Sequence, residues 1–235
     1  MSDGNNMNHE NTNSFRFPRP SRSTRHISPR SRASLRGALV AQLPADRHPR
    51  RIVFESKLEQ RVLHLLLARP DIRDIWDQPP SITYRAVDGR DKRHVFDYLA
   101  TFISGRRIAI VVKPAQRASR PSFQNEFQLI RASTNVAFAH DVILVTDQSF
   151  NPAAARNAAR LHEFRRFADP EADICIRNLI ATFTGETTIA EVVSNSGLGG
   201  RGFRAVFRAI YAGIVQALDE GDIGATTRIV RGIAQ

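Results

Sequence analysis

The sequence has very little cysteine and no long apolar run. Cys175 is the single cysteine among 235 residues, which excludes an internal disulfide and a cysteine-ligated zinc cluster. No apolar run approaches the roughly 20 residues that a membrane-spanning helix needs, and no apolar signal segment follows the N-terminus. We therefore expect a cytoplasmic protein without a membrane partner.

Lysine is also scarce, although the chain is strongly basic. Three lysines stand against 31 arginines, and the formal net charge is +11. Residues 1–51 hold ten arginines and three acidic residues, in a segment rich in Ser, Pro and Asn. Such a segment buries too little apolar surface to fold alone, so residues 1–50 are predicted to form a disordered basic arm. Its expected partner is the phosphate backbone of DNA, and the alternative is a solubilising tail.

Residues 51–168 alternate helical and extended patterns. Apolar residues recur at helical spacing over 54–69, and further helices are expected at 123–134 and 151–167. Strands are expected at 92–103, 106–114 and 140–147, with the first two joined as a hairpin at Ser104-Gly105. This order predicts an α/β fold in which helices cover a mixed sheet.

Residues 169–235 suggest a separate helical domain. Helices are expected at 171–183 and 203–218, and between them Thr188 and Glu191 fit a capping box that starts a helix ending near Gly197. This is a helix-turn-helix pattern, and residues 221–234 are expected to add a small β wing. One helical face carries three arginines that are candidates for DNA contact: Arg201, Arg204 and Arg208. The alternative is a solvated basic face on a protein adaptor.

The candidate catalytic residues are expected around the predicted hairpin. Side chains alternate along a strand, so Lys113 shares a face with Ala109 and Val111 and is carried to the end of the sheet. Asp97 lies on the preceding strand, and the first helix offers Glu55 and Glu59, one turn apart. Carboxylates beside a lysine suit a nuclease that depends on Mg²⁺ or Mn²⁺, whereas a structural ion pair is the alternative.

Three segments occur in this order within residues 50–150: SKLEQRVLHLL, IWDQPPSITY and VKP. Together they resemble the catalytic domain of TnsA-type transposon endonucleases, which belong to the PD-(D/E)xK nuclease superfamily. The resemblance implies a restriction-endonuclease-like fold and a C-terminal winged helix. It assigns catalysis to Glu59, Asp97 and Lys113, with Glu59, Asp97 and the Val112 carbonyl as metal ligands. It also implies a transposase and an ATPase regulator as partners.

One position departs from this family. Val111 stands where the family has an acidic metal ligand two residues before the lysine. In one hypothesis the ligand has moved to Glu126 on the following helix, and the protein is a DNA endonuclease active in transposition or DNA mobilisation. In the other, the site is inactive and the protein is a DNA-binding adaptor. Four arginines are expected to flank the site and bind phosphates: Arg106, Arg107, Arg117 and Arg120.

Overall fold

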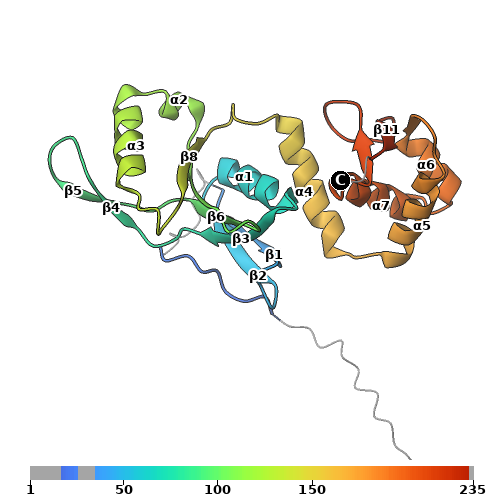
Figure 1. Ribbon diagram of the computed structural model, residues 1–235, viewed down its shortest axis with the longest axis horizontal. Helices are drawn as coiled ribbons and strands as arrows, with labels where there is room; N and C mark the ends of the chain where they lie inside the picture. The colour runs from blue at the N-terminus through green and yellow to red at the C-terminus, as the bar shows by residue number, and fades with distance from the viewer. Residues whose placement is uncertain (1–16, 26–34, 233–235) are drawn as a thin grey trace, which may run out of the picture.

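A four-stranded mixed sheet forms the centre of the computed structural model, which describes residues 17–25 and 35–232 (Figure 1). Its strands lie in the order β3 (Ile72–Asp77), β6 (Tyr98–Phe102), β7 (Arg107–Val112) and β8 (Asp141–Val145). The first two pairings are antiparallel and the β7–β8 pairing is parallel. The predicted hairpin is confirmed, with Gly105 at φ +83° in the turn between β6 and β7.

Helices cover both faces of this sheet. One core packs α1 (Lys57–Ala68) against Ile110 and Val112 of β7. The other packs α3 (Pro121–Ser133) against the opposite face of β7, which carries Val111. The alternation expected for β7 is therefore confirmed, as is the mixed α/β class.

Two further hairpins lie at the margins of the sheet. β1 (Gly37–Ala41) pairs with β2 (Arg50–Phe54), and β4 (Ile82–Arg85) pairs with β5 (Asp91–His94). The strand expected over 92–103 is therefore two strands, β5 and β6, which belong to different sheets. The break between them, residues 95–97, contains the candidate site residue Asp97.

The N-terminal residues that the structure describes are folded, which corrects the expected disordered arm over residues 1–50. Residues 17–25, here called the N-terminal strap, run parallel to β2, with Arg19 bridged to Arg50. The Arg51 amide donates to the Arg19 carbonyl at 2.9 Å, and the Thr24 amide donates to the Gln78 carbonyl at 3.0 Å. Polar contacts with a folded sheet hold the strap, which composition alone does not reveal. Residues 1–16 and 26–34 of the expected arm lie outside the described residues.

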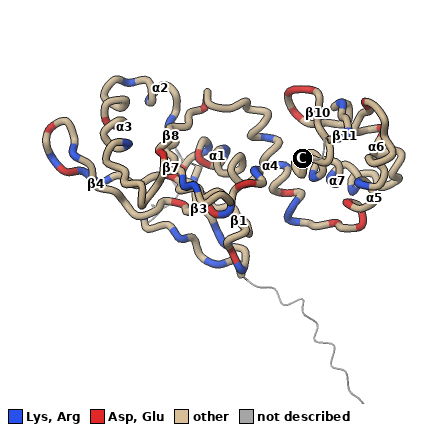
Figure 2. The backbone as a smooth tube through the Cα atoms, viewed as in Figure 1, with Lys and Arg blue, Asp and Glu red and all other residues tan. Residues whose placement is uncertain are grey.

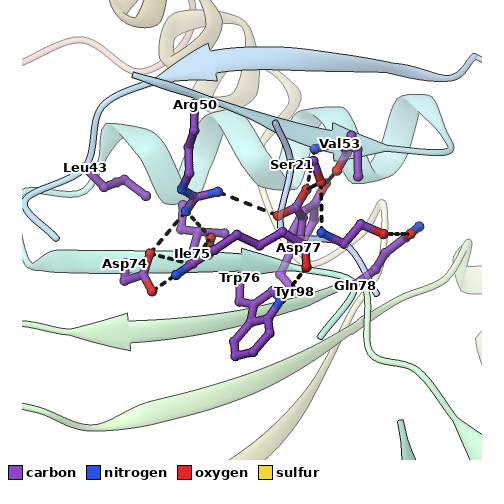
Figure 3. A network of polar contacts seen from close by, with 12 residues as sticks. Ser21, Leu43, Arg50, Val53, Asp74, Ile75, Trp76, Asp77, Gln78 and Tyr98 are labelled. Atoms are coloured by element: carbon purple, nitrogen blue, oxygen red, sulfur yellow. Dashed lines mark hydrogen bonds and ion pairs between the residues drawn. The ribbon is translucent and has the colours of Figure 1, made fainter. Parts of the chain in front are cut away.

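A buried guanidinium joins the strap, β2 and β3 (Figure 3). Arg50 is 2% exposed, and its Nε donates to Asp46 Oδ1 at 2.9 Å. Its Nη2 donates to Asp74 Oδ1 at 3.1 Å and to the carbonyl of Ile75. Its Nη1 lies 3.6 Å from Oδ1 of Asp77, which is fully buried. One arginine thus faces three carboxylates in a low-dielectric environment, and Arg22 supplies a second cation at Asp74.

The same carboxylates hold the strap. Asp77 Oδ2 accepts from the Val53 amide at 2.8 Å and from the Ser21 hydroxyl at 2.5 Å. Arg22 donates to both oxygens of Asp74, at 2.7 and 2.8 Å. These bonds fix the register of the strap against β2 and β3.

The C-terminal residues form three helices and a small sheet. The helices are α5 (Pro170–Ala181), α6 (Ile189–Ser196) and α7 (Gly200–Tyr211), and three antiparallel strands lie in the order β10 (Val215–Ala217), β11 (Arg228–Arg231) and β9 (Thr187–Thr188). The predicted capping box at Thr188 and the end of α6 at Gly197 are both confirmed. The helix expected over 203–218 ends earlier, because Gly213 takes φ +73° and the chain then enters β10.

Helix α4 (Pro152–Arg166) connects the two parts. It packs on α1, and its Leu161 joins the core of the C-terminal helices. The guanidinium of Arg160 lies 4.9 Å from the ring centre of Phe207, and Asn157 donates to the Gly221 carbonyl at 2.9 Å. The expected boundary at residue 168 falls just after this shared helix. Among the described helices, none has both the length and the apolar character needed to cross a membrane.

We predict that Arg50→Ala strongly destabilises the protein, because it leaves buried carboxylates without their cation. The expected loss in free energy of unfolding is about 3–5 kcal/mol, measured by urea denaturation. Arg166→Ala is the control, since its ion pair with Glu163 is exposed, and it should cost about 0.5 kcal/mol or less. A loss near the control value for Arg50→Ala would show that the network contributes little to stability.

Candidate active site

The start of α1 positions Glu59. Ser56 is the N-cap residue, and its hydroxyl accepts from the Glu59 amide at 3.1 Å. The Glu59 carboxylate in turn accepts from the Ser56 hydroxyl at 2.8 Å and from the Glu55 amide at 2.6 Å. This reciprocal capping fixes the carboxylate at the helix start. It also means that both oxygens of Glu59 already have a protein donor.

The β6–β7 pairing positions Asp97. Its amide donates to the Ile110 carbonyl at 3.0 Å, and its Oδ2 accepts from the Val112 amide at 2.6 Å. Its carbonyl accepts from the Gln78 amide at 3.0 Å, which ties it to the end of β3. Gln78 is buried and takes φ +44°, a conformation that few residues other than glycine adopt. The backbone around Asp97 is thus held from two neighbouring strands.

Burial and nearby carboxylates act together on Asp97. Burial, reinforced by the negative charge of Glu59, raises the pKa of Asp97 from 3.8 to about 7. The Val112 amide and the Lys113 ammonium lower the pKa, and Glu55 raises it further. The charges of Glu59 and Lys113 therefore both act on Asp97, as the sequence predicted. The carboxylates near Asp97 raise its pKa more than the Lys113 ammonium lowers it.

Lys113 lies directly after β7, where its amide donates to the Val145 carbonyl at 3.0 Å. In the described part of the chain it forms no ion pair with Asp97 at 4.0 Å or less, so the simple structural ion pair is not observed. The charge of Lys113 also acts on His94, whose pKa is lowered to about 4, chiefly by burial and then by this charge. The buried Nε2 of His94 has no hydrogen-bond partner among the described residues. The sequence analysis missed His94, which carries no motif.

Val111 and Glu126 have neighbours other than the Glu59–Asp97 pair. Val111 is 1% exposed and belongs to the core beneath α3. Glu126 is partly buried and accepts from the hydroxyl of Tyr84, whose pKa is raised to about 12 by burial and by this bond. The charge of Glu126 raises the pKa of His94, whereas the carboxylate that most raises the pKa of Asp97 is Glu59. The hydrogen bond to Tyr84 thus gives Glu126 a structural role.

Glu55 is the carboxylate that the sequence analysis set aside. Its Oε2 lies 3.5 Å from Nη2 of Arg25 on the strap. Its Oε1 is buried and has no hydrogen-bond partner within the described residues. A buried carboxylate oxygen without a donor is costly unless a cation lies near it. The one-turn spacing from Glu59 was the available signal in the sequence.

The donor set suits a metal ion held by few protein ligands. Across residues 17–25 and 35–232, no three His, Cys, Asp or Glu side chains lie close enough to hold one ion. Mg²⁺ is often bound by one or two carboxylates and keeps several waters. Asp97, with a neighbouring glutamate and the Val112 carbonyl at the strand end, fits that smaller set.

The four arginines expected around the site divide into two pairs. Arg107 begins β7 and Arg106 directly precedes it, about 20 Å or more along the strand from Lys113, so the expectation that they flank the site is wrong. Arg106 lies 3.6 Å from Asp141, and Arg107 donates to the Ala137 carbonyl at 2.7 Å.

The other pair follows Lys113 directly. Arg117 lies on α2 (Ala115–Ala118), and Arg120 is the N-cap of α3. Both side chains are exposed, and in the described structure neither forms an ion pair with an acid. They remain candidates for phosphate contact.

Two of the three arginines on α7 are engaged within the C-terminal helices. Arg201 lies 2.8 Å from Asp169 and lowers the pKa of that carboxyl. Arg208 lies 2.6 Å from Asp173. Arg204 forms no ion pair with an acid in the described residues, so it is the remaining candidate on this face.

No family model matches the chain, and a search of curated proteins also gives no match. The functional proposal therefore depends on the geometry above and on the resemblance seen in the sequence.

We predict that Asp97→Asn stabilises the metal-free protein at pH 8 but has little effect at pH 4. The folded chain keeps the Asp97 proton up to about pH 7, whereas the unfolded chain releases it near pH 4. Stability is therefore lost as pH rises from about 4 to 7, and asparagine removes that loss while retaining an acceptor for the Val112 amide. Urea denaturation at both pH values should show a gain of at most about 4 kcal/mol at pH 8. Equal effects at the two pH values would contradict the raised pKa.

Proposed function

We propose that the protein is a metal-dependent DNA endonuclease of the TnsA type that acts in transposition or DNA mobilisation and hydrolyses phosphodiester bonds. The observation that supports this most is the meeting of Glu59, Asp97 and Lys113, which come from a helix start and the ends of two paired strands. Crowded carboxylates with a raised Asp97 pKa are typical of functional sites.

Each residue has a defined task in this proposal. Asp97 and Glu59, with the Val112 carbonyl, would hold Mg²⁺ or Mn²⁺, and Glu55 is the alternative to Glu59 as the second carboxylate because of its unpartnered oxygen. The metal would lower the pKa of a water and stabilise charge on the phosphate. Lys113 would orient the anionic phosphate from the end of β7.

The architecture agrees with the finer assignments, which remain part of the proposal. A mixed sheet covered by helices supports a restriction-endonuclease-like domain, and a helix-turn-helix beside a three-stranded sheet supports a winged-helix domain. The resemblance in the sequence further suggests DNA, a transposase and an ATPase regulator as partners. The proposal includes a cytoplasmic location, which the scarcity of cysteine supports.

A catalytically inactive DNA-binding adaptor is the second candidate. It is supported by Val111, which fills a core position where the family has a metal ligand, and by Glu126, which is bound to Tyr84. A reduced ligand set lowers affinity for Mg²⁺, since fewer anionic oxygens surround the ion.

We predict that the purified protein nicks supercoiled plasmid in Mg²⁺ or Mn²⁺ and that Asp97→Ala lowers the rate at least about a hundredfold. Glu55→Ala should also lower the rate, because it removes an oxygen beside the proposed metal position. Glu163→Gln on the exposed surface of α4 is the control and should cut like the parent.

Glu126→Gln separates the two ligand hypotheses. It should leave most of the nicking, since glutamine still accepts from Tyr84. A loss as large as that of Asp97→Ala would instead make Glu126 the migrated ligand. If the parent protein fails to nick DNA even with its transposase partner, the inactive adaptor is the better description.

A further inference from the structure

A cavity lined by arginines lies beside the start of β2, apart from the candidate active site. It has a volume of about 450 Å³ and lies between the strap and the β1–β2 connection. Figure 2 shows basic positions along these segments at the lower edge of the molecule. The charged side chains that line it are Arg19, Arg22, Asp46, Arg47 and Arg50.

Two of these arginines are already neutralised. Arg50 is bound to Asp46 and Asp74, and Arg22 donates to both oxygens of Asp74. Arg19 and Arg47 are exposed, and within the described residues neither forms an ion pair with an acid. The cavity therefore has two positive charges that form no ion pair in the described residues, beside a network in which Arg22 and Arg50 face Asp46, Asp74 and Asp77.

We propose that this cavity binds backbone phosphates of DNA through Arg19 and Arg47. Guanidinium groups match the geometry of phosphate oxygens, and two unneutralised arginines at one hollow favour an anionic ligand. The Arg50 network holds the strap in place, so Arg19 is presented without ordering a flexible segment on binding. Such contacts position a protein on DNA without reading its sequence.

The location of the cavity suggests how it relates to cleavage, and this step rests on the proposed function. The strap and β2 run in parallel from the cavity at Arg19 and Arg50 to Arg25 and Glu55 at the candidate site. Five residues of extended chain span about 17 Å. At 3.4 Å per nucleotide, the anchored phosphate would lie about five nucleotides from the cleaved bond.

The test measures binding of a fluorescent DNA duplex by anisotropy in EDTA, over a range of salt concentrations. Arg19→Ala/Arg47→Ala should raise the dissociation constant about tenfold and lower the slope of log affinity against log salt by about 2. Arg19→Lys/Arg47→Lys should keep most of the affinity because the charge remains. Thermal unfolding of each variant checks that the fold is unchanged.

Arg85→Ala/Arg90→Ala is the matched control, since it removes from the β4–β5 hairpin two exposed arginines whose side chains form no ion pair within the described residues. It should change affinity and slope much less. Equal losses in the two double variants, or no loss in Arg19→Ala/Arg47→Ala, would overturn the proposal. Because EDTA prevents metal-dependent cleavage, an inactive nuclease site would not affect this result.

Discussion

The ion network around Arg50 determines how the chain is arranged near the candidate site. Buried carboxylates are stable only when cations or donors surround them, and Asp77 is fully buried. Its Oδ2 accepts from groups of β2 and the strap, whereas its Oδ1 has no hydrogen-bond donor in the described structure and lies 3.6 Å from the Arg50 guanidinium. The next residue, Gln78, donates its amide to Asp97. The contacts that compensate the buried charge of Asp77 are therefore linked, through Gln78, to the backbone of the candidate metal ligand Asp97.

Asp97 differs from the carboxylates around Arg50, because no cation lies in contact with its carboxylate in the described structure. Its strongest charged influence is another carboxylate, and Lys113 forms no close ion pair with it in the described structure. A site selected for stability alone would place a cation in contact, as the Arg50 network does. Retaining crowded carboxylates at a cost in stability is characteristic of sites that bind a ligand. The contrast between these two clusters, which Gln78 connects, favours a functional interpretation of Asp97.

Local patterns predicted most of the fold but less of the site. The alternation along β7 placed Val111 and Val112 on opposite faces, because successive side chains of a strand point to opposite sides of the sheet, and each belongs to a different core. The capping box at Thr188 and the glycine turns were also visible, because they depend on neighbouring residues. The strap was missed, since its order comes from bonds to residues 30 to 56 positions away. The engagement of Arg201 and Arg208 was missed for the same reason: their partners Asp169 and Asp173 belong to an earlier helix start.

Glu55 shows how the absence of a ligand at Val111 can be reconciled with a metal site. The resemblance noted in the sequence implies that the missing acid belongs on β7, with Glu126 on α3 as the replacement, but Glu126 accepts a hydrogen bond from Tyr84. Glu55 follows β2 instead, with one buried oxygen unpartnered in the described structure and the other near Arg25. A divalent cation would compete with Arg25 for this carboxylate, because both neutralise the same charge. We therefore expect a metal ion bound at Glu55 to weaken the ion pair between Glu55 and Arg25, which attaches the end of the strap.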